Sequence, residues 1–262
     1  MRALNTAATG MMAQELNVQV ISNNIANMRT TGYKRQRAEF QDLLYEKVTR
    51  VGTQTSTQGN ILPVGIELGA GVKTVGTPRI MTQGTLLPTG NSLDLAIRGE
   101  GFFKIQMPDG TFTYTRDGSF TTDAQGRVVT PQGLVVQPTI TIPQNSTAIT
   151  INSQGQVSAT VAGSTTPTVL GQLTLTRFAN KSGLQSIGDN LFVETPASGP
   201  PTDVTPSTEG VGDLQQGNLE QANVEAVTEI SDLISAQRAY EMNAKVVTAA
   251  DQMLQAASNI LR

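Results

Sequence analysis

The chain of 262 residues contains no histidine, no cysteine and no tryptophan. It therefore has no imidazole base, thiolate nucleophile, Cys/His zinc site or disulfide. Aromatic residues make up only 4% and charged residues only 15%, and the net charge is −3. An acidic chain of this kind is not expected to have nucleic acid as its main partner. Only carboxylate or Ser/Lys chemistry remains for an enzyme, so we expect a non-enzymatic protein that uses no cofactor and no metal.

Long apolar runs are also missing. No run approaches the roughly 18–20 residues that a membrane span requires. The first residues carry one positive charge without a continuous apolar core behind it, which is unlike a secretory signal peptide. We expect no membrane insertion.

Proline and glycine are absent from most of the two ends. All 12 prolines lie between Pro63 and Pro206, and after Gly32 the next glycine is Gly52, while none follows Gly217. Inside a helix, proline and glycine cost roughly 3 and 1 kcal/mol respectively. We therefore predict helical ends and a turn-rich middle.

Apolar residues at both ends recur every seven positions, the period of a coiled coil. The polar segment from Asn27 to Gly32 is predicted to end the first helix, and the last helix is expected to run from Leu219 to Arg262. At 1.5 Å per residue the last helix would reach roughly 60 Å, which is longer than a small core covers. The seam residues are Leu4, Met11, Val18 and Ile25 with Ile21 in the first helix, and Leu233, Tyr240, Val247, Leu254 and Leu261 in the last.

The two ends are therefore predicted to pair with each other, or with the ends of other copies of the chain. Polar seam residues such as Asn243 fit this interpretation because they can fix the register of a helix pair. The alternative is that each helix lies on the core of its own domain.

The middle of the chain is expected to be an all-β domain. Two Asp-Gly steps, at Asp109 and Asp117, lie between β-branched and aromatic residues and indicate hairpins. Residues 195–212 are expected to be a returning linker, and residues 46–86 a loop or disordered stretch that a partner orders. The fold class is α+β, with three parts: 1–35 plus 218–262 as a terminal helical assembly domain, 36–85 as an extended connecting segment, and 86–217 as the central β domain with its linker.

One basic cluster surrounds Tyr33, formed by Arg29, Lys34, Arg35 and Arg37. A single patch in an acidic chain fits a solvated turn, or a subunit contact to an acidic neighbour, better than a nucleic-acid site. Asp109, Asp117 and Asp123 lack the spacing of a calcium loop and are predicted to be turn residues.

Residues 16–27 followed by Thr30-Thr31-Gly32-Tyr33-Lys34 resemble the N-terminal signature of bacterial flagellar rod and hook proteins. Residues 233–247 resemble the C-terminal signature of that family, and residues 97–103 and 114–120 are similar to its central β domain. The motif residues are Asn23, Asn24, Asn27, Gly32, Tyr33, Gln237, Arg238 and Asn243. Residues 44–69 resemble an insertion typical of one rod member, and the rod-stiffening candidates are Glu46, Gln54, Leu62, Pro63 and Leu68.

The resemblance implies an axial structural protein that polymerises into the distal rod of the flagellar basal body. Such a rod carries torque from motor to hook and encloses the export channel. The resemblance implies type III export without a cleaved signal. The implied partners are copies of the chain in a helical homopolymer, proximal rod proteins, hook protein, P- and L-ring proteins and the export apparatus. The alternatives are a proximal rod protein of the same family, a β-rich binding module, and a carboxylate-based hydrolase.

Overall fold

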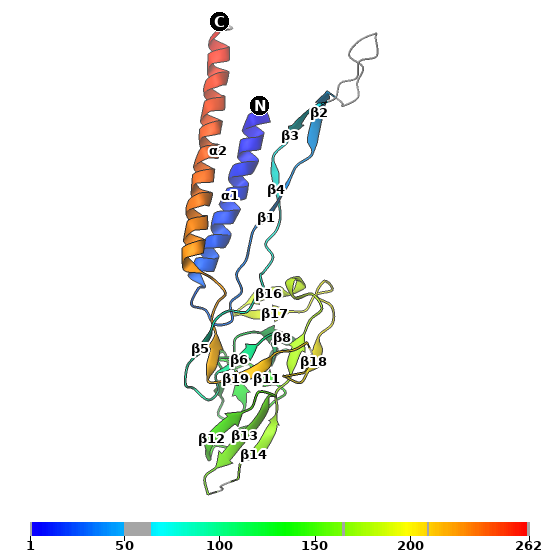
Figure 1. The fold of residues 1–262 in the computed structure, drawn as a ribbon, viewed down its shortest axis with the longest axis vertical. Coiled ribbons are helices and arrows are strands. Elements are labelled where there is room, and N and C mark those ends of the chain that lie inside the picture. The colour runs from blue at the N-terminus through cyan, green and yellow to red at the C-terminus, as the bar shows by residue number, and fades with distance from the viewer. Residues whose placement is uncertain (1, 50–63, 164–165, 209, 261–262) are drawn as a thin grey trace. The chain divides into compact units, whose positions relative to one another are not determined.

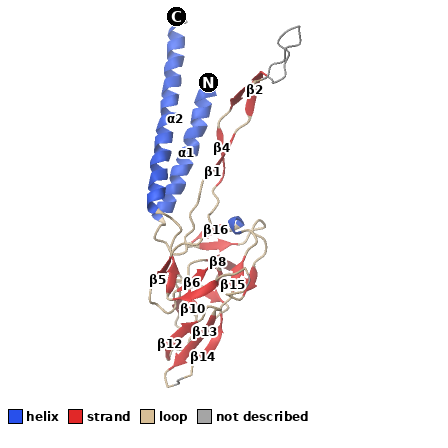
Figure 2. Cartoon of the chain, in the orientation of Figure 1, coloured by secondary structure: helices blue, strands red, loops and turns tan. Residues whose placement is uncertain are grey.

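The computed structural model describes residues 2–49, 64–163, 166–208 and 210–260. Within these residues the chain is α+β, as expected: helix α1 (Arg2–Ala26) lies near the start, helix α2 (Ala226–Ile260) near the end, and twenty short strands between them (Figures 1 and 2). The chain divides into two compact units. The helical unit comprises Met1–Ile25, Gln36–Pro78 and Glu225–Arg262, and the β unit comprises Ala26–Arg35 and Arg79–Val224. The three-part division expected from the sequence stays a prediction.

In the helical unit, α1 and α2 lie side by side and run in opposite directions (Figure 1). Two contacts define their register. Asn24 donates to Glu229 over 3.1 Å, and a Cβ added to Gly10 would lie 2.8 Å from Nδ2 of Asn243. In this register the start of α1 lies opposite residue 251, so the end of α2 extends beyond α1, and residues 251–259 are all exposed.

Helix α2 begins seven residues later than the sequence predicted. Residues 219–225 contain no helix breaker, but Asn218–Glu220 forms strand β20, which pairs with β5 (Leu86–Pro88). The tertiary pairing overrides the local helix propensity. At the start of α2, Glu225 accepts a hydrogen bond from the hydroxyl of Thr228 over 3.0 Å.

The remainder of the helical unit is a two-stranded ribbon. Strand β1 (Glu39–Asp42) pairs antiparallel with β4 (Val72–Gly76), and β2 (Tyr45–Thr49) pairs antiparallel with β3 (Ile66–Gly69). The loop or disorder expected for residues 46–86 is therefore wrong for β3, β4 and most of β2. Residues 50–63 lie outside the described residues.

The β unit centres on an antiparallel sheet of seven strands in the order β16-β17-β8-β7-β11-β10-β9. A second sheet has the order β12-β13-β14, and the pairs β15-β18, β19-β6 and β20-β5 complete the unit. The remaining bounds are β6 (Leu95–Arg98), β7 (Phe103–Gln106), β8 (Phe112–Thr115), β9 (Thr121–Thr122), β10 (Val128–Val129), β11 (Val135–Gln137), β12 (Ser146–Ile151), β13 (Gln156–Val161), β14 (Thr168–Gln172), β15 (Leu175–Arg177), β16 (Gln185–Gly188), β17 (Leu191–Val193), β18 (Thr202–Val204) and β19 (Asp213–Gln216).

The first Asp-Gly step makes the predicted hairpin, between β7 and β8. The second does not, because β8 has only β7 and β17 as neighbours in its sheet. Asp117 accepts from the Ser119 amide over 3.0 Å, and the Gly118 carbonyl accepts from the Leu95 amide over 3.0 Å, so the chain leaves the sheet at this turn. Asp109 and Asp123 also accept backbone N–H groups within their own turns, which confirms all three as turn residues. The expected linker at 195–212 contains β18, which pairs with β15.

Two apolar clusters form the core of the β unit. The larger one joins both sheets and includes Ile105, Val136 and Leu175. The smaller one is aromatic: the rings of Phe102 and Tyr114 both pack edge-on against Phe178, at centroid distances of 5.9 and 4.7 Å. Edge-to-face pairs of this kind add to the stability that burial alone provides.

Candidate functional site

A cluster of three charged side chains lies buried in the β unit. Glu220 at the end of β20 accepts from Nζ of Lys34 at Oε1 over 2.5 Å, and from Nε of Arg116 at Oε2 over 2.9 Å. All three side chains are at most 5% exposed. We call this group the buried ion cluster. Through Glu220 it joins Lys34, from the early part of the chain, to Arg116 in the middle.

Backbone groups complete the hydrogen bonding of the buried ion cluster. Glu220 also accepts from the Gly84 amide over 2.9 Å, and Lys34 donates to the Thr82 carbonyl over 2.8 Å. Nη1 of Arg116 donates to the carbonyls of Gly99 and Gly101. A buried ion pair is retained at low cost only when its remaining polar atoms are satisfied in this way. The interpretation of the basic residues around Tyr33 as a solvated turn is therefore wrong for Lys34.

The electrostatics of the buried ion cluster reflect two cations around one carboxylate. Burial lowers the pKa of Lys34, and repulsion by Arg116 lowers it further, against the attraction of Glu220. Burial alone would raise the pKa of Glu220, but the charges of Arg116 and Lys34 and their hydrogen bonds outweigh it and hold that pKa below its ordinary value. Glu220 is therefore ionised at neutral pH.

Two motif residues next to Lys34 belong to the same part of the β unit. Gly32 has a φ of +67°, and its amide donates to the Glu220 carbonyl over 2.8 Å. A Cβ there would lie 2.6 Å from the Asp117 amide nitrogen, so only glycine fits. Tyr33 is buried, and the Arg79 guanidinium lies 5.8 Å from its ring centroid. Both residues thus shape the turn that places the Lys34 side chain in the buried ion cluster.

Other motif residues act at the helices. Asn24 is buried, accepts from the Gln36 amide over 2.9 Å and donates to the Gln36 carbonyl over 2.8 Å, so it fixes the returning chain against α1. Asn27 accepts from the amide of Thr30 over 3.0 Å just beyond the end of α1. Asn23, Gln237 and Arg238 have exposed side chains.

The predicted seam residues are buried to different degrees within one chain. Ile21 is buried, Leu4, Met11, Val18, Ile25, Leu233 and Val247 are half-buried, and Tyr240 and Leu254 are each 43% exposed. Leu261 lies outside the described residues. Asn243 meets Gly10 of α1, and the small seam residues Ala236 and Ala250 are buried. A single chain thus covers only part of each seam.

A second apolar stripe on α2 was missed by the heptad pattern. Val227, Ile230 and Ile234 follow one another at helical spacing, and Val227 is 74% exposed. Met242, Val246 and Met253 are further exposed apolar residues of this helix. The signal was present in the sequence as a 3–4 spacing beside the seam. Exposed apolar patches of this kind mark protein interaction surfaces.

The ribbon is similarly rich in exposed apolar side chains. Leu44 is 89% exposed, and Tyr45, Val48, Ile66 and Leu68 of strands β2 and β3 are exposed as well. Glu46 pairs with Arg2 of α1 over 2.8 Å, which ties the ribbon to the first turn of the helix. The candidates Gln54, Leu62 and Pro63 lie outside the described residues.

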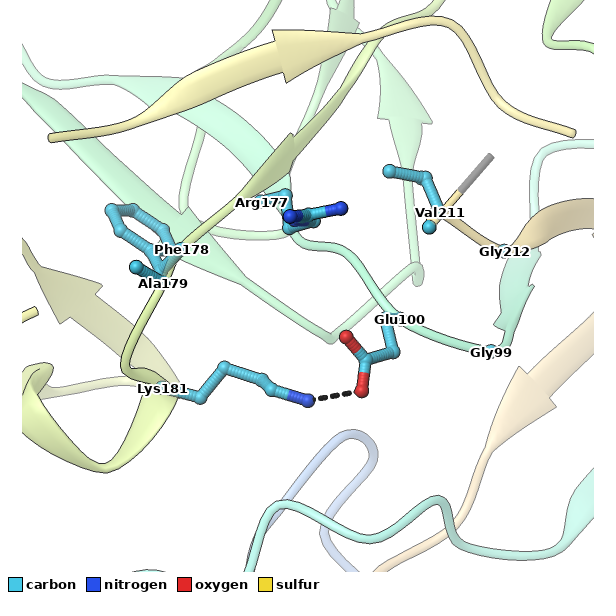
Figure 3. A pocket seen from close by; sticks show the side chains of 9 residues that line it. Gly99, Glu100, Arg177, Phe178, Ala179, Lys181, Val211 and Gly212 are labelled. Atoms are coloured by element: carbon cyan, nitrogen blue, oxygen red, sulfur yellow. Dashed lines mark hydrogen bonds and ion pairs between the residues drawn. The ribbon is translucent and has the colours of Figure 1, made fainter. Parts of the chain in front are cut away.

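An open pocket of about 620 Å³ in the β unit is lined by Glu100, Arg177, Phe178, Lys181 and Val211, among others (Figure 3). Lys181 forms an ion pair with Glu100 at its edge. That carboxylate is neutralised by its lysine, so the pocket resembles an open surface hollow more than a site for acid–base chemistry. In the part of the chain that the structure describes, no three His, Cys, Asp or Glu residues are placed to hold a metal ion. Among the described residues, no helix is long and apolar enough to cross a membrane.

Three family models match successive parts of the chain. Residues 4–34 match the flagella basal body rod protein family, residues 96–159 the flagellar hook protein FlgE/F/G D1 domain, and residues 215–260 the C-terminal region of the flagellar basal body rod FlgEFG proteins. The first match covers α1 from Leu4 onward, the last contains α2, and the middle match contains strands of the β unit.

Curated relatives match the chain over its length. The flagellar basal-body rod protein FlgG of Caulobacter vibrioides is 55% identical over 99% of both chains, and that of Agrobacterium fabrum is 50% identical over 100% of both. The rod protein FlgF of Caulobacter vibrioides is 34% identical over 94% of this chain and 91% of its own. The chain therefore belongs to the family of flagellar basal-body rod proteins, structural proteins of the flagellum, and within it to the FlgG, or distal rod, type.

Proposed function

We propose that this chain polymerises through its two terminal helices into the distal rod of the flagellar basal body, and that the polymer carries torque to the hook and encloses the export channel. The observation that carries this proposal is the surface of α2. Its apolar side chains are only partly covered by α1, and residues 251–259 extend beyond α1 altogether. Burying such surface is favourable by about 25 cal/mol per Å², so these helices gain stability when copies assemble.

The polymer forms by repeated contact between unlike surfaces. Heterologous contacts of this kind give an open filament when the rotation between copies does not close into a ring. The exposed end of α2 is one such surface, because Met253 is 66% exposed and Leu254 43% exposed there. Isolated helices are marginal in water, so the ends are expected to order fully as each copy adds.

The proposed partners follow from the place of the distal rod. They are the proximal rod proteins at one end, the hook protein at the other, the P- and L-ring proteins around it, and the type III export apparatus that delivers the subunits without a cleaved signal. The proposed location is the periplasm-spanning part of the basal body.

The ribbon is proposed to stiffen the rod. Strands β2 and β3 form a two-stranded ribbon with exposed apolar residues along both strands. Such a ribbon is marginally stable by itself and gains from packing on a further element. A neighbouring copy that covers Leu44, Ile66 and Leu68 would bind the ribbon and resist bending between subunits.

The assembly surface is tested by Leu254→Asp, with Gln252→Asp as the matched control on the same exposed stretch of α2. A charge at position 254 enters the proposed apolar contact unpaired, whereas position 252 is already polar. We expect Leu254→Asp to leave the helical content of the purified monomer unchanged in circular dichroism. In electron micrographs, basal bodies from cells with Leu254→Asp should lack distal rods, whereas those from cells with Gln252→Asp should have them. Normal rods from Leu254→Asp would contradict the assignment of this surface.

A further inference from the structure

Methionine is the only sulfur-containing residue of the chain, which has eight methionines and no cysteine. Three methionines of the described residues are more than half exposed: Met12 of α1 is 70% exposed, and Met242 and Met253 of α2 are 60% and 66% exposed. Met81 of the β unit instead packs against the aromatic cluster. The methionines that are most open to solvent therefore lie on the two terminal helices.

The two exposed methionines of α2 belong to one face of that helix. Spacings of four, three and four residues place four exposed, uncharged residues along this face. We call these residues the methionine stripe: Met242, Val246, Ala249 and Met253. The stripe is separate from the side of α2 that meets α1, where Asn243 lies against Gly10. The methionine stripe is therefore part of the apolar surface that α1 leaves uncovered.

The methionine side chain suits such a surface for a physical reason. It is unbranched, has three rotatable bonds and carries a polarisable thioether, so it adapts to irregular neighbours. Peroxides oxidise the same thioether to a sulfoxide, which is polar and chiral. An apolar contact that includes a sulfoxide holds a polar group without a hydrogen-bond partner, and this is unfavourable.

We propose that Met242 and Met253 are modification sites, at which oxidation to the sulfoxide by a peroxide prevents a free copy of the chain from joining the rod. This inference rests on the proposed function, because it requires a neighbouring copy to cover the methionine stripe in the rod. In the reaction with hydrogen peroxide, the sulfur lone pair forms the S–O bond, the O–O bond breaks, and water leaves. The sulfur loses two electrons and the peroxide gains them.

The same contact protects a copy that has already joined the rod. A neighbouring copy that covers Met242 and Met253 excludes peroxide from both sulfur atoms. The stripe is thus sensitive only between export of the chain and its insertion into the rod. A methionine sulfoxide reductase reverses the modification by returning the sulfoxide to the thioether. Oxidation therefore stops the addition of new copies without dissolving the rod.

The first measurement maps the oxidation of each methionine. Purified free chain and purified basal bodies are treated with the same dose of hydrogen peroxide, and peptide mass spectrometry gives the oxidised fraction at each position over time. Met242 and Met253 are expected to react about tenfold more slowly in basal bodies, because burial limits access to the sulfur. Met81 is the internal control and should react slowly in both samples, since it packs within the β unit. Equal rates for Met242 and Met253 in both samples would overturn the proposal.

The second measurement replaces the methionines in a strain that lacks the unaltered chain. Met242→Gln/Met253→Gln imitates the sulfoxide with an uncharged polar side chain of similar length. Met242→Leu/Met253→Leu keeps the apolar surface and has no sulfur to oxidise. Electron micrographs of basal bodies should show about tenfold fewer distal rods with the Gln pair than with the Leu pair. The matched control Val169→Gln/Ile187→Gln makes the same polar change at two exposed apolar residues of the β unit and should build rods in normal number.

Equal rod numbers from the Gln pair and the Leu pair would overturn the proposal, because the polarity of the methionine stripe would then not decide assembly. Circular dichroism of the purified chains checks that both pairs are folded. A pair that does not fold is replaced by its single substitutions at Met242 and at Met253, judged by the same outcomes. Failure of the proposed function is a separate result: in that case the unaltered chain would not restore rods to a strain that lacks it.

Discussion

At the scale of single residues, Glu220 stands out because one buried carboxylate holds two cations and a backbone amide. Lys34, Arg116 and Glu220 are far apart in the sequence, so the cluster joins three distant segments of the β unit. The buried ion cluster contributes to the stability of the fold only when all three charged side chains are present. Breaking a buried pair leaves an uncompensated charge, which costs far more than the intact pair contributes.

We expect Glu220→Gln to lower the free energy of unfolding by about 3–5 kcal/mol, because Lys34 and Arg116 would remain buried without a counter-charge. Glu100→Gln removes the exposed partner of Lys181 and should cost at most about 1 kcal/mol. Urea unfolding followed by circular dichroism compares the two variants. Equal, small losses from both would show that the cluster is not needed for stability.

The same carboxylate predicts a loss of stability in acid. The pKa of Glu220 is lower in the folded chain than in the unfolded one. Its contribution is therefore fully present above the unfolded value of about 4.3 and is lost as the pH falls through the lower folded value. Unfolding free energies measured from pH 7 down to pH 2 should fall more steeply for the unaltered chain than for Glu220→Gln. Parallel profiles would contradict this assignment.

The sequence could not predict the buried ion cluster, although it contains all three residues. Lys34 lies among Arg29, Arg35 and Arg37, a pattern typical of a solvated surface, and its partner is 186 positions away. Burial of a lysine depends on where β20 and β8 come together, which no local pattern records. Asp109 shows the opposite case, because its turn depends on its own neighbours and was predicted correctly.

At the scale of elements, periodicity located both helices, and the Asp-Gly step at Asp109 located the hairpin of β7 and β8, since these signals are local. The beginning of α2 and the ribbon were not predicted for a common reason. The strand at Leu219 depends on its pairing with β5, and β2 and β3 depend on pairing with each other, and no local pattern records either partner. The hairpin after Asp117 failed because Gly118 bonds to Leu95 instead of continuing the ladder.

The ribbon supports a prediction at this scale. Removing residues 46–68 takes away strand β2 beyond Tyr45 and most of β3. We expect export of the shortened chain to continue while its rods bend or stop growing, because contacts that resist bending between subunits are lost. Secreted protein is measured by immunoblot, and rod shape by electron microscopy. Straight rods of normal length would contradict a stiffening role.

At the scale of the whole molecule, the two terminal helices are expected to carry assembly, whereas the β unit has its own core. A chain that lacks both residues 2–26 and residues 226–262 should therefore build no rods when it is the only copy in the cell. The reason is that the shortened chain lacks both the exposed apolar residues of α2 and the helix α1 that packs against α2. Electron microscopy of basal bodies measures this outcome, and any distal rod from the shortened chain would contradict the proposal.

The antiparallel contact between Gly10 and Asn243 also determines when α1 can pack against α2 during synthesis of the chain. A ribosome adds roughly 5–20 residues per second, starting from the N-terminus. Residue 10 therefore emerges well before its neighbour in α2 has been translated. Helix α1 can pack against α2 only after almost the entire chain has been synthesised. Throughout that interval its apolar side has no partner from its own polypeptide and is open to capture by a chaperone.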